Sequence, residues 1–259
     1  MSAALDTVPS FARVFEVVSG FAPASAEALE RASLQRRFDR KYLIEAAEVP
    51  AVVAAVGDAY QVVLARDARF ALYDTFYFDT PSLRSYHAHR RAKRPRFKLR
   101  VRNYIDRALS MLEYKEKTPR GDTRKLRWRR EGLEPALTAA DLALLEAEQP
   151  QLFDEGPLHF KARTVFHRLM LLGTRSVERA TLDFNLELHC AGREKTIRET
   201  VVVEVKDSGR GGASPLVLAL RQARARALPF SKYCMAVAML GGERGNAFLP
   251  SIRAMQGHP

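Results

Sequence analysis

Charged and apolar side chains alternate along several segments of the chain, most regularly in Arg-Phe-Lys-Leu-Arg-Val-Arg at 96–102. Successive side chains of a β-strand point to opposite faces, so the four cations share one face and Phe97, Leu99 and Val101 share the other. A single basic strand is usually a solvated surface strand. Because the same alternation recurs elsewhere, we interpret it as one charged face of a sheet.

This pattern predicts a sheet of eight strands. Turn sequences such as Pro119-Arg120-Gly121-Asp122 separate many of them, which favours hairpins and antiparallel pairing. The sequence therefore predicts an α+β, mainly antiparallel β fold, in which eight strands close into a tunnel or barrel with peripheral helices outside. We expect the strands at 34–45, 70–78, 96–105, 111–117, 123–131, 160–172, 179–183 and 200–206.

Helical spacing and capping residues predict helices between the strands. Thr138 followed by Asp141 is a capping signal, and Ser214-Pro215 combines an N-cap with a proline in the first turn. We expect helices at 25–31, 50–60, 138–150 and 214–228, a short one containing Leu83 and Tyr86, and a last one beginning near 230. The predicted organisation is a helical arm at 1–33, a tunnel domain at 34–240 and a loose tail at 241–259.

The chain is strongly basic: 42 Lys+Arg against 30 Asp+Glu give a net charge of +12. Such a field favours anionic partners. Two cysteines without metal-site spacing indicate a reducing compartment, and neither a signal peptide nor an apolar run of about 20 residues is visible. We expect a soluble cytoplasmic protein. The predicted helix face with Arg221, Arg224 and Arg226 leaves open a peripheral position at a membrane.

In a closed barrel the charged face would point into the lumen. Unpaired buried charges cost several kcal/mol each, so this lumen must be wet or hold an anion, and a chain of phosphates is the most natural occupant. The acids among these residues would offer oxygen ligands to Mg²⁺ or Mn²⁺, which bridge phosphate oxygens. The expected inward set is Lys41, Arg100, Arg102, Glu113, Lys115, Lys125, Arg127, Arg179, Asp183, Glu204 and Lys206.

Seven short motifs occur in an order that resembles a known family. They are Arg37-x-Asp39-x-Lys41-Tyr42, Tyr77-Phe78-Asp79-Thr80, Leu99-Arg100-Val101-Arg102, Glu113-x-Lys115, Arg179-x-Thr181-x-Asp183, Val203-Glu204-Val205-Lys206 and Phe230-Ser231-Lys232-Tyr233. The ordered set resembles the catalytic domain of the vacuolar transporter chaperone (VTC) complex, a polyphosphate polymerase family of the triphosphate tunnel metalloenzyme superfamily. The resemblance covers residues 34 to 240 and implies an eight-stranded antiparallel tunnel.

The resemblance implies transfer of the γ-phosphoryl group of ATP to a growing inorganic polyphosphate chain, with Mn²⁺ or Mg²⁺ held by Glu204. It also leaves open a membrane protein as a further partner. The residues that it implies as catalytic are Lys41, Arg100, Arg102, Lys115 and Glu204. The residues that it implies as phosphate-binding are Lys41, Arg100, Arg102, Lys115, Lys125, Arg127, Arg168, Arg179, Lys206 and Lys232.

One departure separates this chain from hydrolytic members of that superfamily, which open with Glu-x-Glu-x-Lys. Here Arg37-x-Asp39-x-Lys41 has fewer carboxylate oxygens for metals, which argues against two-metal hydrolysis and agrees with the polymerase branch. Two alternatives stay open: a triphosphatase acting on inorganic triphosphate or short polyphosphate, and a non-catalytic polyphosphate-binding module. Nucleic acid is not expected, because aromatic-basic motifs of single-strand binders are lacking. We interpret Asp79 as a turn or cap residue.

Overall fold

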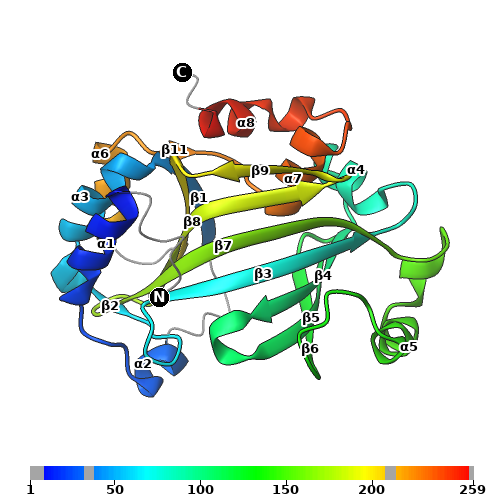
Figure 1. Ribbon diagram of the computed structural model, residues 1–259, viewed down its shortest axis with the longest axis horizontal. Helices are drawn as coiled ribbons and strands as arrows, with labels where there is room; N and C mark the ends of the chain where they lie inside the picture. The colour runs from blue at the N-terminus through cyan, green and yellow to red at the C-terminus, as the bar shows by residue number, and fades with distance from the viewer. Residues whose placement is uncertain (1–8, 32–37, 208–213, 257–259) are drawn as a thin grey trace.

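The computed structural model describes residues 9–31, 38–207 and 214–256. Its centre is one sheet of eleven strands in the described part of the chain, paired antiparallel in the order β11-β1-β10-β8-β7-β3-β4-β5-β6, with β2 on β7 and β9 on β8 (Figure 1). The strands are β1 Phe38–Glu45, β2 Tyr60–Val62, β3 Phe70–Asp79, β4 Arg96–Tyr104, β5 Leu109–Lys117, β6 Thr123–Arg130, β7 His159–Gly173, β8 Glu178–Cys190, β9 Arg193–Ile197, β10 Thr200–Asp207 and β11 Arg226–Ala227.

The predicted α+β, mainly antiparallel class is confirmed, and the eight predicted strands correspond to β1, β3 to β8 and β10. The predicted closure of the sheet into a ring is not confirmed. β6 and β11 form the two ends of the sheet and do not pair with each other in the described residues. β1 and β6 bring Lys41 and Lys125 to the same cavity, and repulsion between like charges disfavours pairing there. The sheet therefore surrounds its charged face without a continuous ring of hydrogen bonds.

Helices cover the face of the sheet opposite the charged side chains. α1, α3 and α6 pack on β1, β7, β8 and β10, and α5 packs on β3 to β5. No described helix is long and apolar enough to cross a membrane. The helices are α1 Pro9–Ser19, α2 Ala26–Arg31, α3 Val49–Ala54, α4 Arg84–Arg90, α5 Ala139–Glu148, α6 Pro215–Gln222, α7 Lys232–Leu240 and α8 Leu249–Met255.

The caps of α5 and α6 are those that the sequence predicts. The backbone N–H of Asp141 donates to Thr138 Oγ1 over 3.2 Å, and that of Val217 donates to Ser214 Oγ over 3.1 Å. α6 is shorter than expected, ending at Gln222, because Arg224 adopts a left-handed conformation with φ 53°. α3 likewise ends at Ala54, and the next residues form a short 3-10 turn that leads into β2.

The helices are peripheral as predicted, but α7 packs on the charged face of the sheet. Tyr233 of α7 stacks on Tyr77 with ring centroids 5.3 Å apart, and both belong to a buried cluster that includes Phe166 and Val202. Val202 and Tyr77 also line the cavity that holds the charged side chains. α7 therefore covers an apolar part of the charged face. α7 lies there because the apolar side chains on this part of the sheet need an apolar partner to exclude water.

Two further expectations differ from the structure near the C-terminus. β8 extends to Cys190 and forms a hairpin with β9, whereas the alternating pattern predicted that this strand ends at Asp183. The tail from 241 is not loose in its described part: Phe248 and Met255 are buried, and Ser251 Oγ donates to the carbonyl of Pro229 over 2.7 Å. Residues 1–8, 32–37, 208–213 and 257–259, which include parts of the predicted helical arm, first strand and C-terminal tail, lie outside the described residues.

Asp79, at the end of β3, joins three elements. Its fully buried carboxylate accepts hydrogen bonds from the backbone N–H groups of Thr80, Ser85 and Tyr86 at 2.8 to 3.0 Å, and from Tyr233 Oη at 2.5 Å. Burial, followed by the nearby Asp79 carboxylate, raises the pKa of Tyr233 well above its usual value. Asp79 is thus the cap residue that the turn sequence predicts, and it also fixes α7.

Replacing Asp79 with alanine is expected to lower the free energy of unfolding by about 2–4 kcal/mol, because four donors lose a charged acceptor in a buried site. Urea unfolding followed by circular dichroism measures this loss. Asp154→Ala is the matched control, because the Asp154 side chain is 63% exposed and its ion pair with Arg84 is long, at 3.8 Å. Equal stability of the two variants would contradict the anchoring role of Asp79.

Candidate functional site

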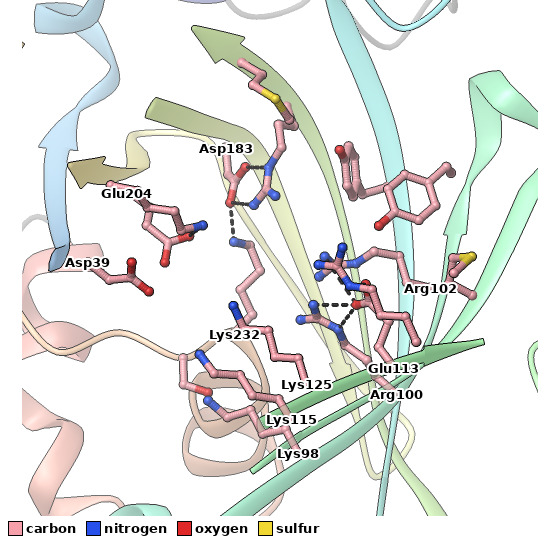
Figure 2. Close-up of a pocket in the computed structure, with 18 of the residues that line it drawn as sticks. Asp39, Lys98, Arg100, Arg102, Glu113, Lys115, Lys125, Asp183, Glu204 and Lys232 are labelled. Carbon is pink, nitrogen blue, oxygen red and sulfur yellow. Dashed lines mark hydrogen bonds and ion pairs between the residues drawn. The ribbon is translucent and has the colours of Figure 1, made fainter. Parts of the chain in front are cut away.

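Alternate side chains from eight strands line one cavity of about 820 Å³. β1, β3 to β8 and β10 all contribute, and the segment 230–232 before and at the start of α7 completes the wall (Figure 2). All the phosphate-binding and catalytic residues predicted from the sequence line this cavity. They are Lys41, Arg100, Arg102, Lys115, Lys125, Arg127, Arg168, Arg179, Glu204, Lys206 and Lys232.

Strand register places the cations of β4, β5 and β6 in rows across the sheet. Arg100 pairs with Glu113, which pairs with Arg127, and one step along the strands Lys98 pairs with Lys115, which pairs with Lys125. Two residues of a strand span about 7 Å, so the two rows are neighbours. We call Lys98, Lys115 and Lys125 the lysine row.

Glu113 holds three arginines together. Arg100 Nε donates to Glu113 Oε2 over 2.6 Å, Arg102 Nη1 lies 3.7 Å from the same oxygen, and Arg127 Nε lies 3.1 Å from Oε1. Burial alone would raise the pKa of Glu113, but the three guanidinium groups outweigh it and lower the pKa to about 2. Glu113 is therefore ionised at neutral pH and fixes the arginines at the wall.

Asp183 is the second neutralising carboxylate. Arg168 donates to it through two hydrogen bonds of 2.6 and 2.7 Å, and Lys232 Nζ forms a short ion pair with Oδ2 (Figure 2). Burial would raise its pKa, but Arg168 and Lys232 lower it to about 2. Ser231 caps α7 by accepting from the N–H of Cys234. The helix start thereby delivers Lys232 to the cavity, where its ammonium also lies 4.3 Å from the centre of the Phe166 ring.

Glu204 lies on β10 opposite Lys41 of β1, beside a second carboxylate, that of Asp39 (Figure 2). Lys206 Nζ donates to Glu204 Oε2 over 3.0 Å, and Lys41 Nζ donates to the carbonyl of Phe230 over 2.7 Å. Burial would raise the pKa of Glu204, yet Lys41, Lys206 and Arg168 hold it well below its usual value. Glu204 is thus an anionic oxygen donor at neutral pH.

The described residues contain no group of three or more His, Cys, Asp or Glu arranged to hold a metal ion. Mg²⁺ on phosphate substrates usually takes one or two carboxylates, several waters and the phosphate oxygens. Glu204, with Asp39 nearby, fits such a site and does not form a cage of protein ligands. The residues present therefore suit a metal that arrives with, or is completed by, a phosphate ligand.

Lys98 is a cavity residue that the predicted site set omitted. Burial, together with the neighbouring cations Lys41, Lys115 and Arg100, lowers its pKa to about 7. Burial also lowers the pKa of Lys232 to about 8. Burial lowers the pKa of Lys115 to about 8 as well, although water screens its exposed side chain. The signal for Lys98 was present in the sequence, because it shares a strand face with Arg100 and Arg102.

Comparison with known proteins points to one family. The model of the VTC domain family matches residues 36–241. Among solved structures, the chain is similar to a putative adenylate cyclase from Bacillus halodurans, with 16% identity, 76% of this chain and 94% of that chain covered and a TM-score of 0.45. It is also similar to a putative adenylyl cyclase from Hippeastrum described as having a dominant triphosphatase activity, with 15% identity, 78% and 95% coverage and a TM-score of 0.45. No match was found among curated proteins.

An antiparallel sheet wrapped around a cationic cavity forms a tunnel-like site whose charge favours polyanions. The chain belongs to the VTC domain family, whose model covers most of its length. Family and cavity together indicate a polyphosphate-related tunnel enzyme that acts by phosphoryl transfer. The roles of individual residues stay predictions.

Tripolyphosphate binding is expected to weaken as pH rises from 6.5 to 9, by about tenfold or more. Lys98 and Lys232, with pKa values of about 7 and 8, lose their protons in the free protein over this range and must regain them to bind an anion. Isothermal titration calorimetry across this pH range measures the trend.

Lys98→Arg is the matched variant, because a guanidinium keeps its charge at pH 9. We expect its affinity to fall less steeply with pH than that of the unchanged protein. Titration of the ligand itself is common to both proteins and cancels in the comparison. Identical pH profiles would show that Lys98 does not titrate in the free cavity.

Proposed function

We propose that this protein is a polyphosphate polymerase, which transfers the γ-phosphoryl group of ATP to the end of an inorganic polyphosphate chain with the help of Mg²⁺ or Mn²⁺. The observation that carries the proposal is the division of charge in the cavity. Glu113 and Asp183 are occupied by ion pairs with cations of the wall. The lysine row and Lys41 face the same cavity, where their charges favour a polyanion.

Phosphoryl transfer needs little covalent chemistry from a protein, because positioning and charge neutralisation supply most of the catalysis. Arg100 and Arg102 are oriented by Glu113 and present their remaining N–H groups to phosphate oxygens. Lys41, Lys115, Arg179 and Lys232 neutralise the triphosphate and the acceptor end, and Arg127, Arg168, Lys125 and Lys206 complete the binding surface. Glu204 holds the divalent cation, which supplies further neutralisation of phosphate charge when bound.

The small number of carboxylates available to bind metal ions in the cavity supports transfer to a phosphate acceptor rather than hydrolysis. A two-metal hydrolase positions two cations around an activated water, which calls for several carboxylate ligands. In the described cavity only Asp39 and Glu204 lie close together outside the two arginine-paired carboxylates (Figure 2). A terminal phosphate is already an anionic nucleophile and needs no base to deprotonate it, so this sparse set of ligands suits a polymerase.

Incubation of the protein with ATP and Mn²⁺ is expected to give ADP and a ladder of polyphosphate chains on a stained gel. Glu204→Gln removes the anionic oxygen donor, so turnover should fall by about 10²-fold or more, while tripolyphosphate binding measured without metal persists. Glu116→Gln is the control, because Glu116 lies on β5 but does not line the cavity.

Each other outcome favours a different function. Inorganic phosphate without a ladder would identify a triphosphatase or polyphosphatase, and tight triphosphate binding without turnover would identify a binding module. Full activity of Glu204→Gln with Mn²⁺ would overturn the assignment of Glu204 as the metal ligand. The polymerase proposal itself is then decided by whether ADP and a polyphosphate ladder are formed.

A further inference from the structure

Cations continue past the lysine row toward the end of the sheet near α4. In the next row along the strands Arg96 of β4 pairs with Lys117 of β5. Both side chains are two residues further along their strands from Lys98 and Lys115, so they share the same face of the sheet. Neither lines the cavity, which places this row just outside it.

Two turns extend this row at the surface. Arg91, Lys93 and Arg94 lie between α4 and β4 and are exposed, as is Arg120 in the turn between β5 and β6. We call these four residues, with Arg96 and Lys117, the basic rim.

The two turns of the basic rim lie against each other. A Cβ atom on Gly121 would lie 2.7 Å from Arg94 Nη1, so the guanidinium packs directly on this glycine, whose φ of 92° suits the turn. Arg96 Nη1 donates to the carbonyl of Lys93 over 3.1 Å. The cations of two separate loops thus form one continuous surface beside the cavity.

Few acids offset this surface. Residues 90–98 contain six cations and no acid, and Asp122 is the one acid of the segment 118–124. Glu116 lies on the opposite face of β5, because it is one residue away from Lys115 and Lys117. Like charges at this density repel, and a polyanion that displaces their counterions is the ligand that relieves the repulsion.

We propose that the basic rim is a second binding site for polyphosphate. It would hold the part of the polyphosphate polymer that lies outside the cavity. The inference rests on the proposed function, and it adds a surface to which no role has been given. A linear polyanion can follow the rows from Arg100 through the lysine row to Arg96 and Lys117 without a gap in positive charge. An anionic membrane is the weaker candidate, because no large apolar side chain is exposed in the described segments 90–98 and 115–125 for insertion into lipid.

The test compares binding of tripolyphosphate, which the cavity alone can hold, with binding of long-chain polyphosphate. The variant carries Arg91→Gln, Lys93→Gln and Arg120→Gln, three exposed residues outside the cavity. We expect its Kd for the long chain to rise about tenfold, with a shallower dependence on salt, and its Kd for tripolyphosphate to stay within about twofold. Both Kd values are measured by titration calorimetry at several salt concentrations.

A second triple variant removes the same net charge elsewhere: Arg13→Gln, Arg198→Gln and Arg221→Gln, all at exposed positions away from the basic rim. Charges beyond about 8 Å are largely screened at physiological salt, so this variant should bind both ligands as the unchanged protein does. Equal losses in the two triple variants would show a general charge effect and overturn the proposal.

Three other outcomes are decisive. Unchanged long-chain affinity in the rim variant would overturn the proposal. Loss of binding to phosphatidylserine vesicles, with long-chain affinity retained, would reassign the basic rim to a membrane and also overturn it. If the unchanged protein bound the long chain through the basic rim but bound no tripolyphosphate, the proposed function of the cavity would fail while the rim site stood.

Discussion

The concentration of cations on one face of a sheet is the constraint on which the rest of this structure depends. Left alone, these side chains would repel one another and keep the sheet from curving around them. Glu113 and Asp183 remove much of that repulsion, each by binding two or three cations of the cavity wall. The Asp183 pair has a second effect, because Lys232 begins α7 and thereby ties the covering helix to the charged wall.

α7 divides the inner face of the sheet into an apolar part and an ionic part. Its buried side is held by Tyr233 through Asp79, and its first residue is held by Asp183. Both anchors are carboxylates, Asp79 on β3 and Asp183 on β8, and these two strands flank β7. The position of one helix therefore depends on buried carboxylates, as the cavity wall does. An apolar helix beside the charges also lowers the local polarity, and burial therefore lowers the pKa of Lys98 and Lys232 more than the neighbouring cations do.

Alternation along the strands predicted the eight strands around the cavity and most of the charged side chains that line it, because strand geometry determines which residues share a face. Lys98 was omitted from that set, and Arg168 and Lys232 were named only through the family resemblance. The alternation did not place α7, since the apolar residues of α7 have the composition of any buried helix and carry no sign of which face they cover. The β8–β9 hairpin and α8 were missed for a related reason. Whether such short apolar segments form strands or helices depends on burial against the rest of the fold, as the buried Phe248 and Met255 show. Closure was overestimated because the pattern contains no information on pairing between β1 and β6.

The contrast between arginines and lysines in the cavity bears on how a polymer could move through it. Arg100, Arg102 and Arg168 are fixed by carboxylates, so each presents phosphate oxygens with donors in one orientation. Lysine ammonium groups have flexible stems and bind phosphate as point charges, without demanding one geometry. In the proposed polymerase reaction the polyphosphate must shift by one unit after each transfer, and movement along a row of sites requires binding that is favourable yet readily released. Fixed arginines suit the place where the reacting phosphates are aligned, whereas the lysine row suits the path along which the finished part of the chain slides.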